Sequence, residues 1–212
     1  MVSRNGTLAG LPRFLIVLLV LFAACKEAKQ RGSQKNAENT AQSTFRSRYS
    51  FQTHLARGND AFDVFTEGYG SLRTMTIIHE RNNLADTVRE EIDGTVVNAA
   101  CADLDSDSLP EVYVFAQSAG SGSYANLYGF QFHHRVAQPI LLPELDKRQS
   151  AGYLGHDTLW VQDSILVRMF PVYTEGDMNA SASGGMRTLE YVLQRDAKGN
   201  LCLRCTRATN KQ

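Results

Sequence analysis

Short segments of β-branched and aromatic residues, separated by turn residues, make up most of the chain. EVYVFAQ (111–117) and NLYGFQF (126–132) are single segments of this kind, whereas residues 158–173 and 187–207 each contain two around a turn. Such segments, bounded by turn residues, predict β-strands. We therefore expect an all-β fold of about eight strands, an antiparallel β-sandwich or barrel in a single domain over residues 45–207. Residues 208–212 are expected to be a tail.

Two predicted hairpins have recognisable turns. One centres on Gln162-Asp163-Ser164, and the other on Asp196–Asn200, where Gly199 suits a left-handed backbone position. NNLADTVREE (82–91) is the one stretch with a helical leaning. No repeat with a period of about 20 to 50 residues occurs, which argues against a propeller or a solenoid.

The first 24 residues have the parts of a secretory signal peptide. Arg4 and Arg13 precede the apolar run FLIVLLVLFAA (14–24), which is too short for a helix that spans a bilayer. FAAC, which ends at Cys25, resembles the lipobox of bacterial lipoproteins, although it has Phe22 where leucine is usual. The resemblance implies that Cys25 is lipidated and that the protein is attached to a membrane of the bacterial cell envelope, facing the periplasm or the cell surface. Simple secretion with cleavage nearby is the alternative.

Residues 25–44 read as a tether between that lipid anchor and the domain. Between Lys26 and Thr44 there is no aromatic residue and no aliphatic residue larger than alanine. A segment of this composition cannot bury enough apolar surface to fold, so we expect it to be disordered.

The balance of acidic and basic residues bears on whether the protein binds nucleic acid. Lysine plus arginine and aspartate plus glutamate both total 22, so we expect no nucleic-acid partner.

Apart from Cys25 there are three cysteines, Cys101, Cys202 and Cys205. Cys202 and Cys205 fall on opposite faces of a predicted strand, which disfavours a redox pair or a zinc site. Small core residues or one structural disulfide both remain open.

DLDSDSLPE (103–111) is the candidate metal site, with acids at its first, third, fifth and ninth positions. These are Asp103, Asp105, Asp107 and Glu111. Alternate side chains of a tight turn can converge on a hard cation, and calcium takes oxygen ligands. We expect no obligatory cofactor, and calcium is the one candidate. A solvated acidic turn between two strands explains the same composition.

QSAGSGSY (117–124) lies between two predicted strands and could carry a nucleophile or hold a phosphate. The chain has no G-x-S-x-G elbow around its serines, no HExxH, and neither glycine-rich phosphate motif. We therefore expect a protein that is not an enzyme.

Three stretches together resemble one family. They are residues 102–124, 152–173 and 176–193, and in that order they resemble the periplasmic inhibitors of I-type (invertebrate-type) lysozyme. The resemblance covers roughly residues 99–193. It implies an all-β sandwich, often dimeric, that binds lysozyme and occludes the active-site cleft with an S-G-x-Y loop. Here that loop is Ser121-Gly122-Ser123-Tyr124, complete.

The chemistry of the S-G-x-Y loop suits that role. Ser121 would reach a catalytic carboxyl group, and Tyr124 would anchor the contact. Gly120 and Gly122 would allow positive φ and a close approach to the cleft wall. A second loop, SASGGMR (181–187), contains Arg187, which could pair with an acid at the rim. The alternatives are that QSAGSGSY is only a mobile hairpin loop, or that the chain is a calcium-stabilised envelope module that binds glycan or protein.

Overall fold

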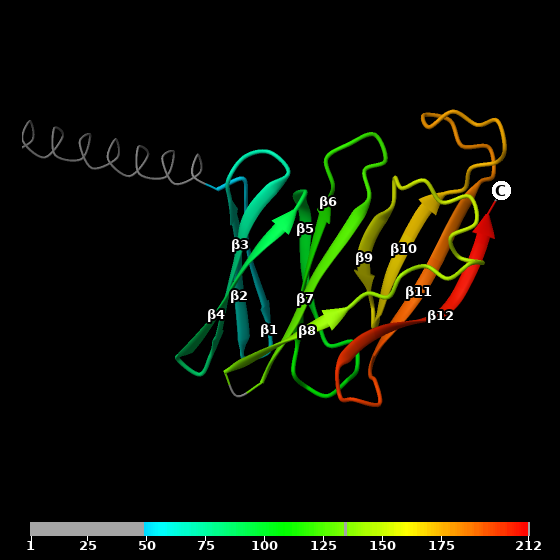
Figure 1. The fold of residues 1–212 in the computed structure, drawn as a ribbon. Coiled ribbons are helices and arrows are strands. Elements are labelled where there is room, and N and C mark those ends of the chain that lie inside the picture. The colour runs from blue at the N-terminus through cyan, green and yellow to red at the C-terminus, as the bar shows by residue number, and fades with distance from the viewer. Residues whose placement is uncertain (1–48, 134, 212) are drawn as a thin grey trace, which may run out of the picture. The chain divides into compact units, whose positions relative to one another are not determined.

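The computed structural model describes residues 49–133 and 135–211, which form twelve strands and no helix (Figure 1). The strands are β1 (Phe51–Arg57), β2 (Asp60–Glu67), β3 (Leu72–Arg81), β4 (Leu84–Asp93), β5 (Thr95–Ala102), β6 (Glu111–Gln117), β7 (Ala125–His133), β8 (Val136–Leu141), β9 (Thr158–Gln162), β10 (Ile165–Pro171), β11 (Met186–Arg195) and β12 (Leu201–Lys211). The all-β prediction is confirmed. The predicted signal peptide, the tether and Cys25 lie outside the described residues.

The strands form two sheets. A four-stranded antiparallel sheet has the order β1-β2-β3-β4, and an eight-stranded sheet has the order β5-β6-β7-β8-β12-β11-β10-β9. The larger sheet curls until β9 lies near β5 and β7, so it is a nearly closed, barrel-like sheet. β8 and β12 pair in parallel, with Leu201 opposite Ile140, and every other pairing is antiparallel among the described strands.

β6 contributes side chains to both hydrophobic clusters, one on each of its faces. Its first six residues are all buried, because each of its faces is covered by a different layer. Val112, Val114 and Ala116 pack toward the four-stranded sheet, in a cluster with residues of β2, β3 and β4. Tyr113 and Phe115 point to the other side, into the interior of the curled sheet. A strand covered on both faces reads as a continuous apolar run, as VYVFA (112–116) does.

Three details differ from the sequence prediction. The strand count is twelve and not about eight, mainly because the segment before Thr95 forms a whole sheet of its own. NNLADTVREE is not helical: Asn82 and Asn83, both at positive φ, form the turn between β3 and β4. β12 also extends through Lys211, which pairs with Met186, so residues 208–211 belong to the sheet and are not a tail.

Both predicted hairpin turns are present. Gln162 pairs with Ile165, and Asp163 between them has φ 52°. Arg195 pairs with Leu201, and Gly199 in the intervening turn has φ 84°. Among the described residues, none lies in a helix long and apolar enough to cross a membrane.

Candidate functional site at the loop end of the larger sheet

The S-G-x-Y loop connects β6 to β7 and is closed at its base by two hydrogen bonds. The backbone N–H of Ser118 donates to the Tyr124 carbonyl oxygen at 2.9 Å, and the backbone N–H of Tyr124 donates to Ser118 Oγ at 3.0 Å. Inside the loop, the N–H of Ser123 donates to the Gly120 carbonyl at 3.2 Å. These bonds close the base of the loop and the turn from Gly120 to Ser123, which indicates a defined conformation.

The two glycines of the loop are required for different reasons. Gly120 has φ 137°, as expected, and Ser123 is held at φ 41°. Gly122 does not have positive φ, so that part of the prediction is wrong. Its missing side chain instead makes room for Tyr124, because a Cβ at Gly122 would collide with Cε2 of the Tyr124 ring.

Two distant segments brace the tip of the loop from outside. The backbone N–H of His156 donates to the Gly122 carbonyl at 2.6 Å, and Asn179 Nδ2 donates to the Ser121 carbonyl at 2.8 Å. The His156 and Asn179 side chains also meet, with Nε2 and Oδ1 3.3 Å apart. Gly155 has φ 93° and lies so close to the Gly122 carbonyl that no side chain would fit there. The loop, residues 152–157 and residues 174–185 are therefore joined into one surface.

A buried ion pair supports this surface from below. The Asp157 side chain is fully buried; its Oδ1 accepts the Ala125 backbone N–H at 2.8 Å, directly after Tyr124. Its Oδ2 accepts Arg168 Nε at 2.7 Å and lies 2.6 Å from Arg168 Nη2. The hydroxyl of Tyr153 donates to Asp157 Oδ2 at 3.1 Å and accepts from Arg168 Nη2 at 2.8 Å. Charge-assisted bonds of this kind, in a site with little water, hold their partners firmly.

The titration of this cluster follows from its burial. Burial alone would lower the pKa of Arg168, but the Asp157 carboxylate, Tyr153 and Tyr191 together outweigh burial and raise that pKa. Burial also raises the pKa of Tyr153 to about 12, although Arg168 acts in the opposite direction. Arg168 therefore remains charged, and Tyr153 protonated, at neutral pH. Sequence reasoning did not find Asp157 or Arg168 as a pair, because nothing in a single acid and a single arginine 11 residues apart indicates contact.

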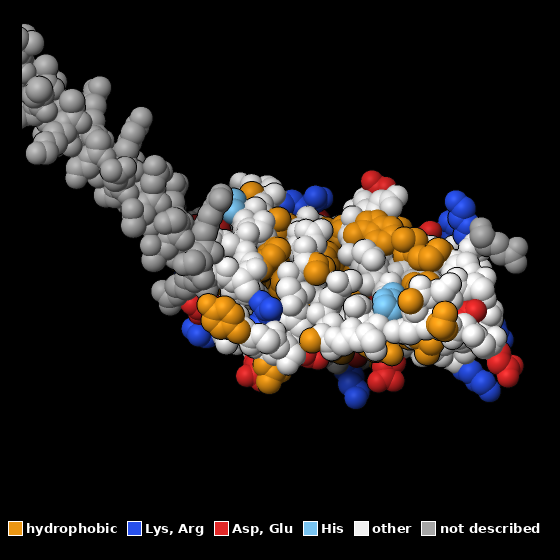
Figure 2. All heavy atoms as spheres, turned by 90° about the horizontal axis from the view of Figure 1, so that it is seen from above, with side chains coloured by type: hydrophobic (Ala, Val, Ile, Leu, Met, Phe, Trp, Pro, Cys, Tyr) orange, Lys and Arg blue, Asp and Glu red, His pale blue; other side chains and the backbone are white. Residues whose placement is uncertain are grey.

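Above this support, the loop presents an aromatic and mainly uncharged face. Tyr124 is 46% exposed and its ring meets that of Tyr153 edge-on, with centroids 5.7 Å apart. Ser121 is exposed beside it. Figure 2 looks onto this end of the sheet: hydrophobic side chains lie among uncharged loop atoms, and most charged side chains lie at the edges. Leu154 and Met178, from the two bracing segments, are also large exposed hydrophobic residues.

Arg187 is placed differently from the prediction. It is only 8% exposed and lies at the start of β11, below the loops. Its Nη1 donates to the carbonyls of Gln149 and Ala151, both at 2.7 Å, and its Nε donates to Asn210 Oδ1 at 2.8 Å. These bonds hold the segment before residue 152 in place. Arg187 therefore has a structural role and no free guanidinium for a partner's acid.

The acidic loop lies between β5 and β6, at the other end of β6. The carboxylates of its four acids come together, with one oxygen from each within 4.8 Å of the others: Asp103, Asp105, Asp107 and Glu111. Asp103 Oδ1 is buried and has no hydrogen-bond partner among the described residues. Its Oδ2 accepts the Ser108 backbone N–H at 3.2 Å, and Ser106 and Ser108 both have positive φ. The predicted convergence of these acids is thus present, and their oxygen donors are of the kind that calcium takes.

Glu111 is the most buried member of this group, with no exposed surface. Its Oε2 accepts the Leu104 backbone N–H at 2.9 Å and the Tyr113 hydroxyl at 3.0 Å, and its Oε1 accepts Gln131 Nε2 at 3.2 Å. Burial raises its pKa to about 7, although these hydrogen bonds act in the opposite direction. Burial also raises the pKa of Asp105, with the neighbouring Asp107 adding to the effect. The cluster thus favours either a proton or a cation.

The three cysteines of the domain are free thiols, so the disulfide alternative does not occur among the described residues. Cys205 packs beside the interior cluster of the larger sheet, whereas Cys101 packs beside the cluster between the two sheets. Burial raises the pKa of the Cys101 thiol to about 12. A thiol of that pKa is protonated and unreactive at neutral pH, which fits a packing role.

A scan of protein-family models and a search of curated proteins find no match to this chain. The lysozyme-inhibitor resemblance therefore stays a prediction from the sequence of residues 102–124, 152–173 and 176–193.

Proposed function

We propose that this protein inhibits lysozyme, with I-type lysozyme favoured, by placing the Ser121-Gly122-Ser123-Tyr124 loop in the active-site cleft. The observation that supports the proposal is that the loop tip is exposed and yet fixed, by Asn179 and His156, to two other segments. Binding by a loop that is already ordered avoids most of the entropy cost of immobilising it.

The loop's exposed groups suit a cleft built for sugar hydroxyls. Glycosidases of this kind hold a pair of carboxyl groups beside the scissile bond. The Ser121 hydroxyl can donate to such a carboxylate, as a substrate hydroxyl would. Tyr124 presents an amphipathic ring that is supported by Tyr153 and by the bare backbone of Gly122. Tyrosine anchors of this type carry much of the energy in protein interfaces. Inhibition is then steric and non-covalent.

The same proposal includes the place of action. Lipidation at Cys25 would attach the chain to a membrane of the bacterial cell envelope, and residues 26–44 would let the folded part reach its target. Acyl chains add membrane affinity of about 0.8 kcal/mol for each buried CH₂ group. A lipid-anchored inhibitor would protect peptidoglycan close to the membrane that carries it.

The test is lysis of peptidoglycan by I-type, c-type and g-type lysozymes, with and without the purified protein. Tyr124→Ala and Ser121→Ala should each weaken inhibition by more than about 1 kcal/mol, roughly a fivefold rise in the inhibition constant. Thermal stability should change little, since both side chains are exposed. Tyr69→Ala is the matched control, because Tyr69 is 92% exposed and lies in the turn between β2 and β3. Absence of inhibition of the I-type enzyme at micromolar concentration would overturn the proposal.

The acidic loop favours a second candidate, a calcium-stabilised envelope module that binds glycan or another protein. The specific observation is the buried and unpartnered Asp103 Oδ1 among three further carboxylates. Calcium binding would be seen as heat in a calorimetric titration and as a rise in unfolding temperature with calcium concentration. Asp103→Asn should reduce both signals, whereas Asp86→Asn, a change of the same charge on β4, should not. An absence of calcium heat with the wild-type protein would exclude this module, and lysozyme inhibition that needs no calcium would favour the first proposal.

A further inference from the structure

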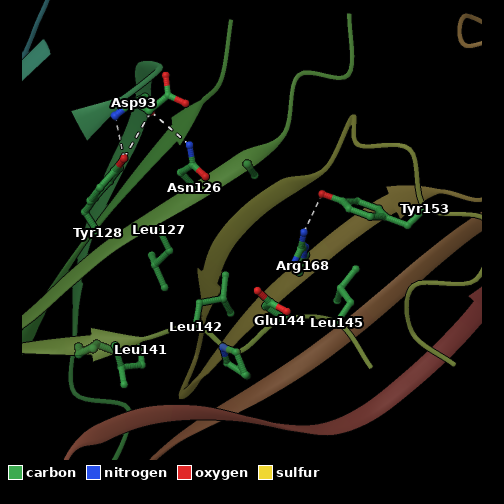
Figure 3. Close-up of a pocket in the computed structure, with 13 residues that line it drawn as sticks. Asp93, Asn126, Leu127, Tyr128, Leu141, Leu142, Glu144, Leu145, Tyr153 and Arg168 are labelled. Atoms are coloured by element: carbon green, nitrogen blue, oxygen red, sulfur yellow. Dashed lines mark hydrogen bonds between the residues drawn. The ribbon is translucent and has the colours of Figure 1, made fainter. Parts of the chain in front are cut away.

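A cavity of about 620 Å³ opens directly beside the base of the S-G-x-Y loop (Figure 3). Its wall includes Ala125, which follows Tyr124 in the chain, and Tyr153, on whose ring Tyr124 rests. A partner that covers Tyr124 would therefore also lie against the mouth of this cavity. The volume is in the range that holds a small molecule or a long side chain.

The cavity has an uncompensated negative charge. Arg168 reaches it, but that guanidinium is already neutralised by Asp157. In Figure 3 the Glu144 carboxylate is directed toward the cavity, on the side of Arg168. Across residues 49–133 and 135–211, Glu144 has neither a hydrogen bond nor an ion pair, and it is exposed. The cavity therefore attracts a cation.

The walls of the cavity near Glu144 are apolar, and the methylene stem of an entering side chain would lie against them. Leu127, Leu142 and Leu145 surround the approach to Glu144. Arginine and lysine bury their methylene stems on surfaces of this kind while the charged head reaches a polar partner. A small polar ligand would leave these leucines exposed to water, and an acidic ligand would be repelled by Glu144.

We propose that this cavity receives an arginine or lysine side chain from the rim of the lysozyme cleft, which pairs with Glu144 while the S-G-x-Y loop occupies the cleft itself. This inference rests on the proposed function and adds a second contact to it, one that selects lysozymes with a basic residue at that place. A carboxylate beside a planar guanidinium can form two parallel hydrogen bonds, so arginine would give the tighter contact.

The test measures inhibition constants of the full chain against I-type lysozyme. Glu144→Gln should raise the inhibition constant about tenfold, and Glu144→Lys should raise it further through repulsion. Glu91→Gln is the matched control: Glu91 is an exposed acid on β4 that does not line the cavity, and its replacement should leave the constant unchanged. Both positions are exposed, so the three variants should fold, which the unfolding temperature checks.

A double-mutant cycle identifies the partner's residue. Each arginine and lysine at the cleft rim of the lysozyme is replaced by alanine in turn. One of these replacements should raise the inhibition constant of the wild-type chain but leave that of the Glu144→Gln variant unchanged. If Glu144→Gln inhibits as well as the wild type while Tyr124→Ala inhibits poorly, this inference is wrong and the proposed function stands. If the wild-type chain inhibits no lysozyme, both are wrong.

Discussion

The two loops at the ends of β6 use similar short polar residues in opposite ways. At one end, residues 118–124 are closed by hydrogen bonds at the base of the loop, and Ser121 and Tyr124 are exposed. At the other end, residues 103–110 lead into Glu111 and turn carboxylates toward one another. The Asp157–Arg168 ion pair lies beneath the first loop, and the loop itself presents an uncharged face. The outward-facing loop is thus supported by paired groups beneath it, whereas the acids of the other loop face one another.

The largest expected effect comes from removing that support. Asp157→Ala leaves Arg168 charged, buried and unpaired, and it removes the acceptor of the Ala125 N–H. Breaking a buried pair by deleting one partner costs about 3 to 5 kcal/mol in the free energy of unfolding. Urea unfolding monitored by circular dichroism measures it.

The double variant Asp157→Leu with Arg168→Met serves as the control for this change. It removes both charges and should recover much of the lost stability. A loss below about 1 kcal/mol in Asp157→Ala would mean that the pair does not support the loop end.

The next effect concerns the acidic end and depends on pH. The pKa of Glu111 is raised in the folded state from its ordinary 4.5 to about 7. The folded chain therefore holds a proton that the unfolded chain releases. The contribution of Glu111 to stability is complete below about pH 4.5 and is lost as the pH rises through 7. From pH 4 to 8 without calcium, the loss is on the order of 3 kcal/mol.

Glu111→Gln isolates this contribution. The variant should show a flatter dependence of the unfolding free energy on pH between 4.5 and 7, measured by denaturant titration in a calcium chelator. Added calcium should raise the stability of the wild-type chain above pH 7, where the carboxylate is ionised, and should do so less in the variant. Identical pH profiles for the two proteins would show that Glu111 titrates normally.

The smallest effect tests the brace at the loop tip. Asn179→Ala removes the 2.8 Å hydrogen bond to the Ser121 carbonyl, which is exposed, so stability should fall by less than about 0.5 kcal/mol. Inhibition should weaken by about 0.5 to 1.5 kcal/mol, because the loop would have to be ordered on binding. Ser181→Ala, in the same loop, is the control and should leave inhibition unchanged. Equal inhibition by both variants would show that the tip needs no brace from residue 179.

Turn chemistry accounts for most of what sequence reasoning predicted correctly. Gly199 and Asp163 lie in the two predicted hairpin turns, and both have positive φ there. The failure at NNLADTVREE has the same origin. Asn82-Asn83 is a pair suited to a two-residue turn with positive φ at both positions. The residues after the asparagines have a local helical leaning, which the tertiary pairing of β4 with β3 overrides.

The all-β class, the two hairpin turns, the spacing of the four acids and the composition of the S-G-x-Y loop can all be read from the amino-acid sequence alone. Those features depend on residues that are neighbours in the chain, where local sterics and side-chain alternation decide. Long-range packing, by contrast, brings Asn179 to the Ser121 carbonyl, 58 residues earlier, and places Asp157 against Arg168 and the Ala125 N–H. It also buried Arg187 and opened the cavity at Glu144. Such contacts arise because the larger sheet curls until strands distant in sequence face each other, and no local pattern records that curvature.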